Sequence, residues 1–337
     1  MIDYVNYGIV RLPYSDKVRV VAQTSGDVET FCDCEQLAGH NGFVMIPFSV
    51  TDDSPVLLVR PDVDVTMPYE TVIRGVGACE VRMESGDKET YMSQFDLFHD
   101  SVCSDFDKLV LSRCVDGRYR GDETAVFAKA CARYPRSMVY MFHSAKEGTW
   151  IGATPEILLS GKHPRYSTVA LAGTNIYSEN LIWSDKNKEE QALVAQYIRD
   201  SLSSYTTGLK ENGPYTSRAA NLAHLKTDFS FDIMSDTDVV TLVRVLHPTP
   251  AVCGLPKEKA LAYINKYEHS RRRYYSGVTG VLDIKGETEL YVNLRCAHFK
   301  DGHVRLYAGG GIMRDSDAES EWNETESKLH TICSVLS

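Results

Sequence analysis

The 337-residue sequence predicts a single α+β domain built mostly from antiparallel strands. Short β-branched runs and helical segments alternate in an uneven order, and turn residues repeatedly return the chain in an antiparallel manner. No Pro/Gly/Ser-rich linker, internal repeat or low-complexity tract divides the chain. A prior of roughly 100–200 residues per domain would allow two domains, but we expect one domain over 1–337, with a β-rich N-terminal part at 1–100.

Residues 1–100 are predicted to be rich in strands because short apolar runs are separated there by clusters of Asp, Ser, Gly and Pro. The segment 89–105 follows and is predicted to be a helix, since its apolar residues recur roughly at helical spacing. The strands expected in this part of the chain are 7–12, 18–24, 43–50, 55–61 and 72–83.

Helices and strands continue to alternate after residue 105. The helix 185–205 is well marked, because Ser184 is a suitable N-cap and Val194, Ile198 and Leu202 recur every four residues. The other helices expected are 124–135, 256–269 and a last helix from 316 or 317 to 336. The strands expected are 108–115, 137–144, 149–160, 168–174, 239–248, 279–284, 290–299 and 304–312.

Composition excludes several classes of protein. The formal net charge of −10 argues against a general nucleic-acid binder, and no run reaches the ~18 apolar residues that span a bilayer. The N-terminus lacks the basic-then-apolar layout of a signal peptide. The 9 cysteines are scattered and include no CxxC pair, which is typical of reduced thiols in a cytoplasmic protein. An anionic substrate would therefore need a local cationic pocket or a metal ion.

Two charged residues lie beside apolar segments. Lys108 opens the predicted strand 108–115, where a lysine is typical of a protected strand edge but would serve as a base if it pointed into a pocket. Glu190 lies on the apolar stripe of the helix 185–205, four residues before Val194. A carboxylate there is costly unless it is paired or binds a metal. The alternative is a boundary glutamate that reaches solvent near the start of the helix.

The C-terminal segment combines a glycine run with an acidic helix face. The run at 308–312 would let backbone amides approach an anion, although a plain turn explains it equally well. Glu321, Glu324 and Lys328 fall at i, i+3 and i+7 of the last helix and share one face. Together with Glu190, the two glutamates would form an all-oxygen site of the kind that Mg²⁺ prefers. A solvated face with a Glu–Lys pair is the alternative.

Several short segments occur in one collinear order over most of the chain after residue 100. They are KLVLSR (108–113), IGATPEILL (151–159), ALAGT (170–174), SDKNKEEQ (184–191), AHL (223–225), HPTPAVCGLP (247–256), YYSGVTG (274–280), VNLRCA (292–297), RLYAGGGI (305–312) and SDAESEWNETESK (316–328). In these segments the chain resembles the chorismate-utilising enzymes, which include isochorismate, salicylate, anthranilate and aminodeoxychorismate synthases. The resemblance implies antiparallel sheets packed as a sandwich with helices outside, and a catalytic core in 101–337.

The resemblance also implies chorismate as the substrate and a role for individual residues. Lys108 corresponds to the base that activates water, and Glu156 to the general acid that protonates the departing hydroxyl group. Glu190 and Glu324 correspond to ligands of an expected Mg²⁺ cofactor. Glu321 would hold a metal-bound water or contact the metal ligands rather than the metal itself. The positions that correspond to substrate-binding residues are Gly173, Thr174, His224, Thr249, Tyr275, Arg295, Gly309, Gly311 and Lys328.

A water-using member of the family fits these motifs best. Ala172 stands where aminodeoxychorismate synthases commonly carry a nucleophilic lysine, and LAGT differs from the PIAGT of anthranilate synthases. Isochorismate synthase, an isomerase that feeds menaquinone or siderophore synthesis, is the first interpretation and salicylate synthase the second. An anthranilate synthase large subunit or a catalytically silent chorismate-binding protein are further alternatives. We expect a cytoplasmic enzyme without nucleic-acid, membrane or obligate protein partners, whose metal site is anionic until Mg²⁺ binds.

Overall fold

Two antiparallel β-sheets organise the chain, whose computed structural model describes residues 4–219, 222–235 and 237–336. Within these residues, sheet A has ten strands, and each joins its neighbours in antiparallel register. In spatial order they are β15 (Gly254–Leu255), β8 (Lys108–Gly121), β19 (His303–Ile312), β18 (Cys296–Lys300), β10 (Gly148–Thr154), β9 (Met138–Ser144), β1 (Asn6–Arg11), β2 (Lys17–Gln23) and β6 (Val63–Pro68), while β7 (Cys79–Met83) also pairs with β8.

Sheet B has nine strands in the described part of the chain, and all of its pairings are antiparallel as well. In spatial order they are β13 (Thr206–Ala219), β14 (Leu222–Ile233), β12 (Arg165–Ile176), β11 (Ile157–Lys162), β17 (Thr288–Val292), β16 (Val278–Leu282), β4 (Gly42–Ile46), β5 (Val56–Val59) and β3 (Glu29–Phe31). The predicted α+β class with mostly antiparallel strands is therefore confirmed.

The two sheets pack face to face over a core that is rich in aromatic side chains. Phe43 from sheet B and Tyr140, Phe142 and Trp150 from sheet A are fully buried in this core. The ring centroids of Phe43 and Phe142 lie 6.0 Å apart in a stacked arrangement. Because large rings bury much apolar area, this layer joins the two sheets into one sandwich.

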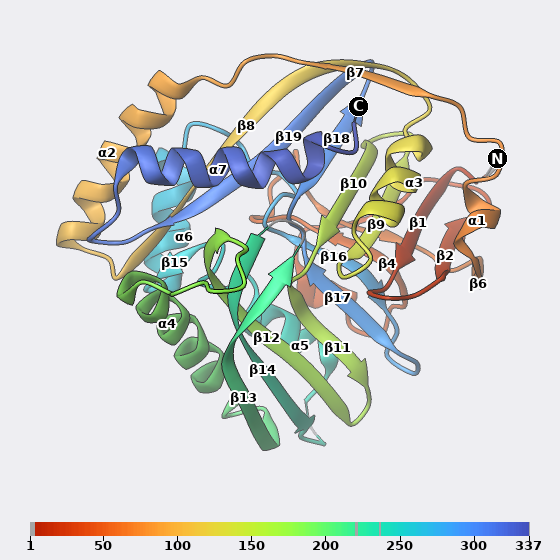
Figure 1. The fold of residues 1–337 in the computed structure, drawn as a ribbon. Helices are drawn as coiled ribbons and strands as arrows, with labels where there is room; N and C mark the ends of the chain where they lie inside the picture. Colours follow the sequence, from red (N-terminus) through yellow and green to blue (C-terminus); the bar gives the residue numbers. More distant parts are fainter. Residues whose placement is uncertain (1–3, 220–221, 236, 337) are drawn as a thin grey trace.

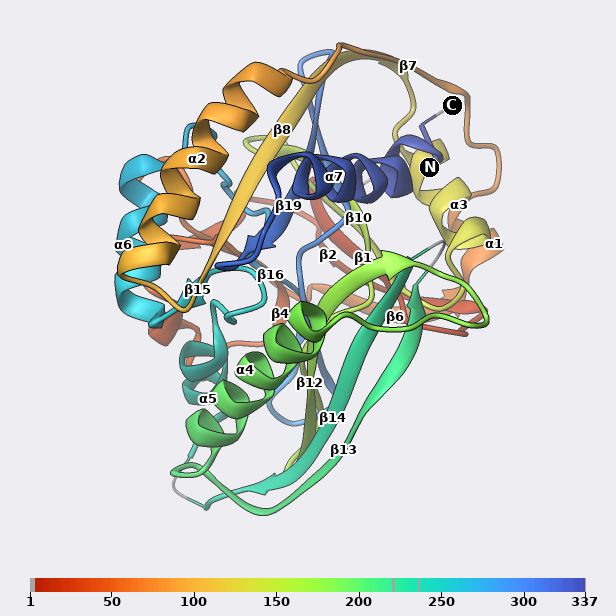
Figure 2. The same cartoon turned by 60° about the vertical axis from the view of Figure 1, so that its left-hand side comes forward.

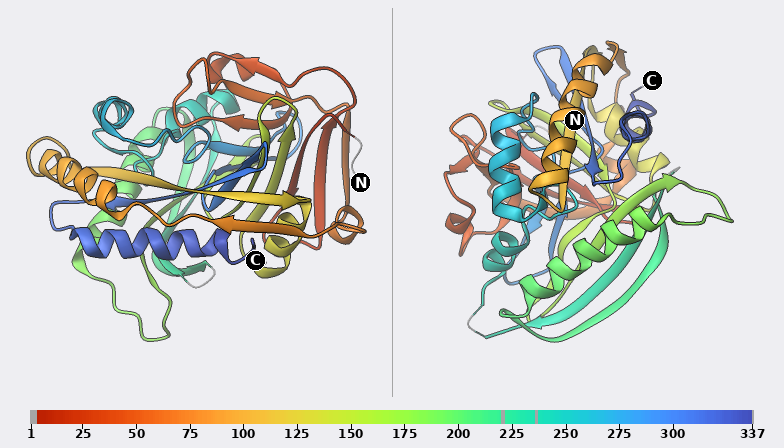
Figure 3. Two further views of the ribbon diagram at one scale, coloured as in Figure 1. Left: turned by 90° about the horizontal axis from the view of Figure 1, so that it is seen from above. Right: turned by 90° about the vertical axis from the view of Figure 1, so that its left-hand side faces the viewer.

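Helices cover the outer faces of the sandwich (Figures 1 and 2). In the described residues they are α1 (Tyr69–Val72), α2 (Lys88–Ser104), α3 (Thr124–Arg133), α4 (Asp185–Leu202), α5 (Val239–Leu246), α6 (Lys257–Tyr267) and α7 (Ala318–Cys333), with a short 3-10 helix, η1 (Cys34–Leu37). Helices α4 and α5 pack on sheet B, and α3 and α7 on sheet A. Helices α2 and α6 cover the end of β8, as the view from above shows (Figure 3). Among all the residues that the structure describes, no helix is long and apolar enough to cross a membrane.

The prediction of a strand at 239–248 is wrong, since this segment forms α5. Its β-branched composition suggested a strand, but Val239, Val243 and Leu246 are buried at helical spacing. The Asp238 carboxylate accepts a hydrogen bond from the backbone N–H of Thr241 at 2.7 Å and so caps the helix. Tertiary burial and the cap together outweigh the strand propensity of the valines.

Two predicted strands each pass from one sheet to the other. Segment 149–160 leaves sheet A after Thr154 and enters sheet B at Ile157, and segment 290–299 crosses between Val292 and Cys296. The two crossings are hydrogen-bonded to each other, because the Val292 N–H donates to the Glu156 carbonyl at 2.9 Å. Glu156 and Arg295 therefore lie together at the two crossings. The long hairpin of β13 and β14 was not among the predicted strands.

Candidate active site

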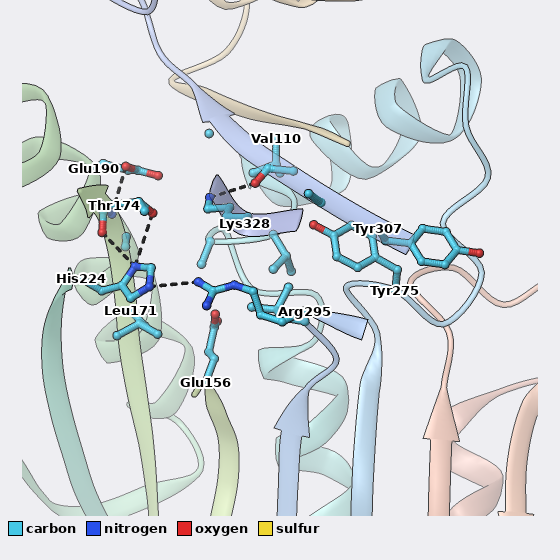
Figure 4. A pocket seen from close by; sticks show the side chains of 18 residues that line it. Val110, Glu156, Leu171, Thr174, Glu190, His224, Tyr275, Arg295, Tyr307 and Lys328 are labelled. Carbon is cyan, nitrogen blue, oxygen red and sulfur yellow. Dashed lines mark hydrogen bonds between the residues drawn. The ribbon is translucent and has the colours of Figure 1, made fainter. Parts of the chain in front are cut away.

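One cavity brings together most of the predicted site residues (Figure 4). The predicted residues that line it are Glu156, Gly173, Thr174, Glu190, His224, Tyr275, Arg295, Gly309, Gly311 and Lys328. Four others, Lys108, Thr249, Glu321 and Glu324, are not part of the lining. Lys108 pairs with Glu190 and Thr249 with Glu156, while Glu324 pairs with the lining residue Lys328.

Glu156 lies at the first crossing between the sheets and is 3% exposed. The Thr249 hydroxyl donates a hydrogen bond to Glu156 Oε1 at 3.3 Å. Burial raises the pKa of Glu156 to about 7, although Lys108, Thr249 and Arg295 act in the opposite direction. The carboxyl can therefore hold a proton near neutral pH, which a general acid has to do.

Arg295 lies at the second crossing, with a backbone φ of 51°. Figure 4 shows its guanidinium group between the His224 imidazole and the Glu156 carboxyl. Arg295 Nη2 donates to His224 Nε2 at 3.0 Å, and the opposite ring nitrogen, Nδ1, lies 3.2 Å from the Gly173 carbonyl oxygen. Burial and Arg295 hold the pKa of His224 well below its usual value, so the ring is neutral and donates from Nδ1. Burial also lowers the pKa of Arg295.

Lys108 and Glu190 form a buried ion pair. Lys108 is 0% exposed and its ammonium nitrogen lies 2.7 Å from Glu190 Oε1. The Gly173 N–H donates to Glu190 Oε2 at 3.1 Å. Burial alone would raise the pKa of Glu190, but Lys108 outweighs it and the pKa lies below the usual value. Lys108 is thus an internal residue rather than the protector of an exposed strand edge.

The glycine run is an extended strand within β19 rather than a turn. A Cβ atom at Gly311 would lie 2.5 Å from Glu190 Oε1 and 2.8 Å from Lys108 Cε. A Cβ atom at Gly310 would lie 3.0 Å from Glu321 Oε2. The glycines therefore leave space for buried charged side chains on both sides of the strand.

Comparison with known proteins identifies the family. A sequence profile for chorismate binding enzymes matches residues 80–337. The chain belongs to the chorismate-binding enzymes. Isochorismate synthase EntC of Escherichia coli (strain K12) is 33% identical over 243 residues, covering 68% of this chain and 62% of that protein. Isochorismate synthase MenF of the same organism is 34% identical over 244 residues, covering 69% and 56% respectively. The match thus spans less than two thirds of either relative.

A solved structure of a chorismate-binding enzyme has a similar fold. The structure is of MenF, the menaquinone-specific isochorismate synthase from Escherichia coli, with a TM-score of 0.85 at 22% identity. The alignment covers 99% of this chain and 89% of that chain. The family resemblance drawn from the short segments is therefore confirmed, and so is the fold that it implied.

The expectation of an uncompensated anionic metal site is wrong for this chorismate-binding enzyme. Each of the three predicted metal carboxylates lies beside a lysine ammonium group. The pairs are Lys108–Glu190 at 2.7 Å, Lys328–Glu324 at 2.6 Å, and Lys186–Glu321. Among the described residues, no three His, Cys, Asp or Glu side chains are already arranged to hold a metal ion. The three lysines give the cluster a formal charge of zero.

The residues nevertheless fit a hard divalent cation. Glu321 Oε1 accepts from the Ser316 hydroxyl at 2.8 Å, whereas Oε2 is buried and has no hydrogen-bond partner. Gly310, which has no side chain, borders this unsatisfied oxygen. An unpaired buried carboxylate oxygen is costly, and all-oxygen ligand sets suit Mg²⁺. Burial and Glu324 both raise the pKa of Glu321, which a cation would reverse.

Sequence reasoning missed two residues that shape the site. Lys186 lies one helical turn before Glu190, and this i to i+4 spacing was the signal that could have revealed it. Tyr307 lines the cavity and stacks on Tyr275, with ring centroids 5.4 Å apart. Tyr307 precedes the glycine run on the same strand, so its strand position alone gave no sign of a site role.

Proposed function

We propose that the protein is a Mg²⁺-dependent isochorismate synthase, an isomerase that converts chorismate to isochorismate. The observation that carries this proposal is Glu156, a buried carboxyl with a pKa of about 7, which shares its surroundings with the buried amine of Lys108. An acid and a base are what the exchange of one ring hydroxyl for another requires, because hydroxide leaves poorly and water attacks poorly. The family and the names of its relatives support this choice of substrate.

The chemistry divides between these two side chains. Lys108 carries a proton while it pairs with Glu190 and must first release it; its free amine then takes a proton from the water molecule that adds to ring carbon C2. Glu156, in its protonated form, gives a proton to the hydroxyl group at C4, which leaves as water. One water enters and one leaves, so the reaction is an isomerisation with no net change in composition.

The remaining residues hold the dianionic substrate. Arg295 and Lys328 are cations in the cavity lining, and the Tyr275 hydroxyl borders Gly309; we assign these residues to the carboxylate of the enolpyruvyl side chain. After Leu306, β18 no longer pairs with β19, so this edge of the glycine run can offer backbone amides to the same carboxylate. A Mg²⁺ ion held by Glu190 and Glu324, with Glu321 nearby, would supply Lewis-acid polarisation of the ring carboxylate.

The decisive experiment is product identification. Purified protein is incubated with chorismate and Mg²⁺, with and without EDTA, and the products are separated by chromatography. We expect isochorismate, and no turnover with EDTA. Salicylate with pyruvate would identify a salicylate synthase instead, anthranilate formed with ammonium salts would identify an anthranilate synthase, and the absence of any product would overturn the proposal.

Removing the acid should remove activity without removing the fold. Glu156→Gln keeps the shape of the side chain but cannot donate an acidic proton, so we expect kcat to fall by about 10²–10⁴-fold. The matched control is Glu89→Gln, since Glu89 is exposed on α2 and lies outside the cavity lining. Steady-state kinetics and circular dichroism test both variants; full activity of Glu156→Gln would refute the assignment of the acid.

A further inference from the structure

Lys186 is the one lysine of the three ion pairs that the proposed reaction does not use. Its partner Glu321 is 2% exposed at its side chain, and the Lys186 side chain is 24% exposed. Lys186 does not line the cavity, so it is not placed to contact chorismate. A nearly buried ion pair outside the substrate cavity needs its own explanation, because desolvating two charges is costly.

The position of Lys186 links the two halves of the metal site. Lys186 is the second residue of α4, which packs on sheet B and carries Glu190. Glu321 lies in the first turn of α7, which packs on sheet A and carries Glu324. The ion pair therefore joins the two helices that supply the predicted metal carboxylates.

We propose that Lys186 is the built-in counter-cation of the metal site, which neutralises Glu321 while no metal ion is bound and competes with the ion for this carboxylate. The inference rests on the proposed Mg²⁺ site. With three lysines and three glutamates the cluster is formally neutral; without Lys186 it would carry one net negative charge in a buried position. The protein thus folds without the metal ion, and the positive charge of Lys186 weakens the affinity of the site for Mg²⁺.

Two consequences follow from removing the positive charge. The repulsion between the ammonium group and a divalent cation disappears, so Mg²⁺ should bind more tightly. The metal-free protein should lose stability, because Glu321 then has an unpaired charge in a buried place. The stabilisation that Mg²⁺ confers should consequently grow, since a ligand that binds only the folded state raises the free energy of unfolding with the logarithm of [L]/Kd.

The experiment compares the substrate-free protein with K186M, K186Q and K186R. Mg²⁺ affinity is measured by titration calorimetry, and Tm is measured with EDTA and with saturating Mg²⁺. We expect both neutral variants to bind Mg²⁺ at least about threefold more tightly than the original protein, with a lower Tm in EDTA and a larger rise on adding Mg²⁺. K186R keeps the charge and should behave like the original protein. K186Q keeps a side-chain group that can donate a hydrogen bond to Glu321, so it replaces K186M in the comparison if K186M does not fold.

Lys188→Met is the matched control, because Lys188 lies on the same helix, is 60% exposed and pairs with the exposed Asp185 at 3.0 Å. It should leave the affinity and the Tm shift unchanged. An unchanged or weaker Mg²⁺ affinity in the neutral Lys186 variants would overturn the role of Lys186 while leaving the proposed function intact. If the original protein binds no Mg²⁺ and still forms isochorismate in EDTA, the metal site itself fails, and the inference fails with it.

Discussion

At the scale of single residues, Glu156 should set the pH dependence of the reaction. Burial raises its pKa to about 7, and only the protonated form can donate to a leaving hydroxyl group. The protonated fraction falls as pH rises through this value, so kcat should decline on the alkaline side of about pH 7. A pH–rate profile of kcat tests this, and a plateau that extends unchanged through pH 9 would contradict the assignment.

The Thr249 hydroxyl should tune this pH dependence. It donates to Glu156 Oε1, and a hydrogen bond to a carboxylate favours the ionised form, so this contact lowers the pKa. Thr249→Val removes the donor at nearly constant volume, and we expect the alkaline limb of the profile to move to higher pH. Thr249→Ser keeps the donor and should leave the limb in place. A limb that moves to lower pH in the valine variant would show that the hydroxyl raises the pKa of Glu156 instead of lowering it.

Gly311 should be intolerant of a side chain. A Cβ atom there would lie within 2.5 Å of Glu190 Oε1 and 2.8 Å of Lys108 Cε, so Gly311→Ala must displace the buried ion pair. Overpacking of this kind costs about 1–3 kcal/mol of stability, and we also expect at least a tenfold loss of kcat because Lys108 moves. Gly77→Ala is the control, since the nearest atom to its added Cβ is 3.8 Å away. Urea denaturation and kinetics would detect both effects; a fully stable and active Gly311→Ala protein would contradict them.

At the scale of elements, the buried ion pair of Arg272 and Glu268 supplies hydrogen bonds to β8 beyond the point where its short neighbour β15 ends. The Glu268 carboxylate accepts from the Ser112 N–H at 2.7 Å, and Arg272 Nη2 donates to the Val110 carbonyl at 2.7 Å. Arg272 Nη1 also donates to the Val252 carbonyl at 2.6 Å. Side chains thus satisfy backbone groups of the strand that begins with Lys108, and they attach it to the segment that follows Thr249.

Breaking this pair should destabilise the protein strongly. Arg272→Ala leaves Glu268 charged and buried and frees two backbone carbonyls, so we expect a loss of about 3–5 kcal/mol. The neighbouring Arg271→Ala is the control, because Arg271 pairs with Asp53 at the surface, with exposures of 83% and 80%, and such pairs contribute about 0–1 kcal/mol. Urea unfolding monitored by circular dichroism compares the two variants. Equal losses would show that the contacts of Arg272 with β8 do not matter for stability.

Sequence reasoning succeeded for elements whose local pattern agrees with their burial and failed where tertiary context decides. The capped helix 185–205 corresponds to α4, and the strand that begins at Lys108 corresponds to β8. The valine-rich 239–248 is helical because only packing reveals its buried face. Sheet membership could not be predicted either, since nothing local in 149–160 or 290–299 tells that the chain changes sheets at Glu156 and Arg295.

At the scale of the whole molecule, the net charge of −10 is compatible with an anionic substrate because charge is arranged locally. The motifs pointed to the three carboxylates and, among the lysines that pair with them, to Lys108 and Lys328, but not to Lys186. Lys186–Glu321 joins α4 to α7 and Lys108–Glu190 joins β8 to α4, so their geometry depends on how the sheets pack, whereas Lys328 and Glu324 both lie on α7. Arg295, placed at a crossing between the sheets, then adds a cation beside the neutral His224. The packing of the sheets thus brings two cations, Arg295 and Lys328, into the lining of one cavity.

The N-terminal part of the chain contributes to both sheets and should not unfold separately. Strand β1 lies between β9 and β2 in sheet A, while β4 lies between β16 and β5 in sheet B. The aromatic core between the sheets combines Phe43 from this part with Tyr140 and Trp150 from the rest. Loss of residues 1–100 would therefore expose the backbone edges of two sheets and part of the shared core at once.

This arrangement predicts a single cooperative unfolding transition. Tryptophan fluorescence reports on the inner core at Trp150, on the contact with β14 at Trp183 and on the helical layer at Trp322. Far-ultraviolet circular dichroism reports on the backbone throughout. In a two-state transition the two signals change at the same urea concentration. The control is Trp150→Phe, which removes the probe in the shared core and should leave the coincidence intact. Separate midpoints in the original protein would instead show that the N-terminal part folds as an independent unit.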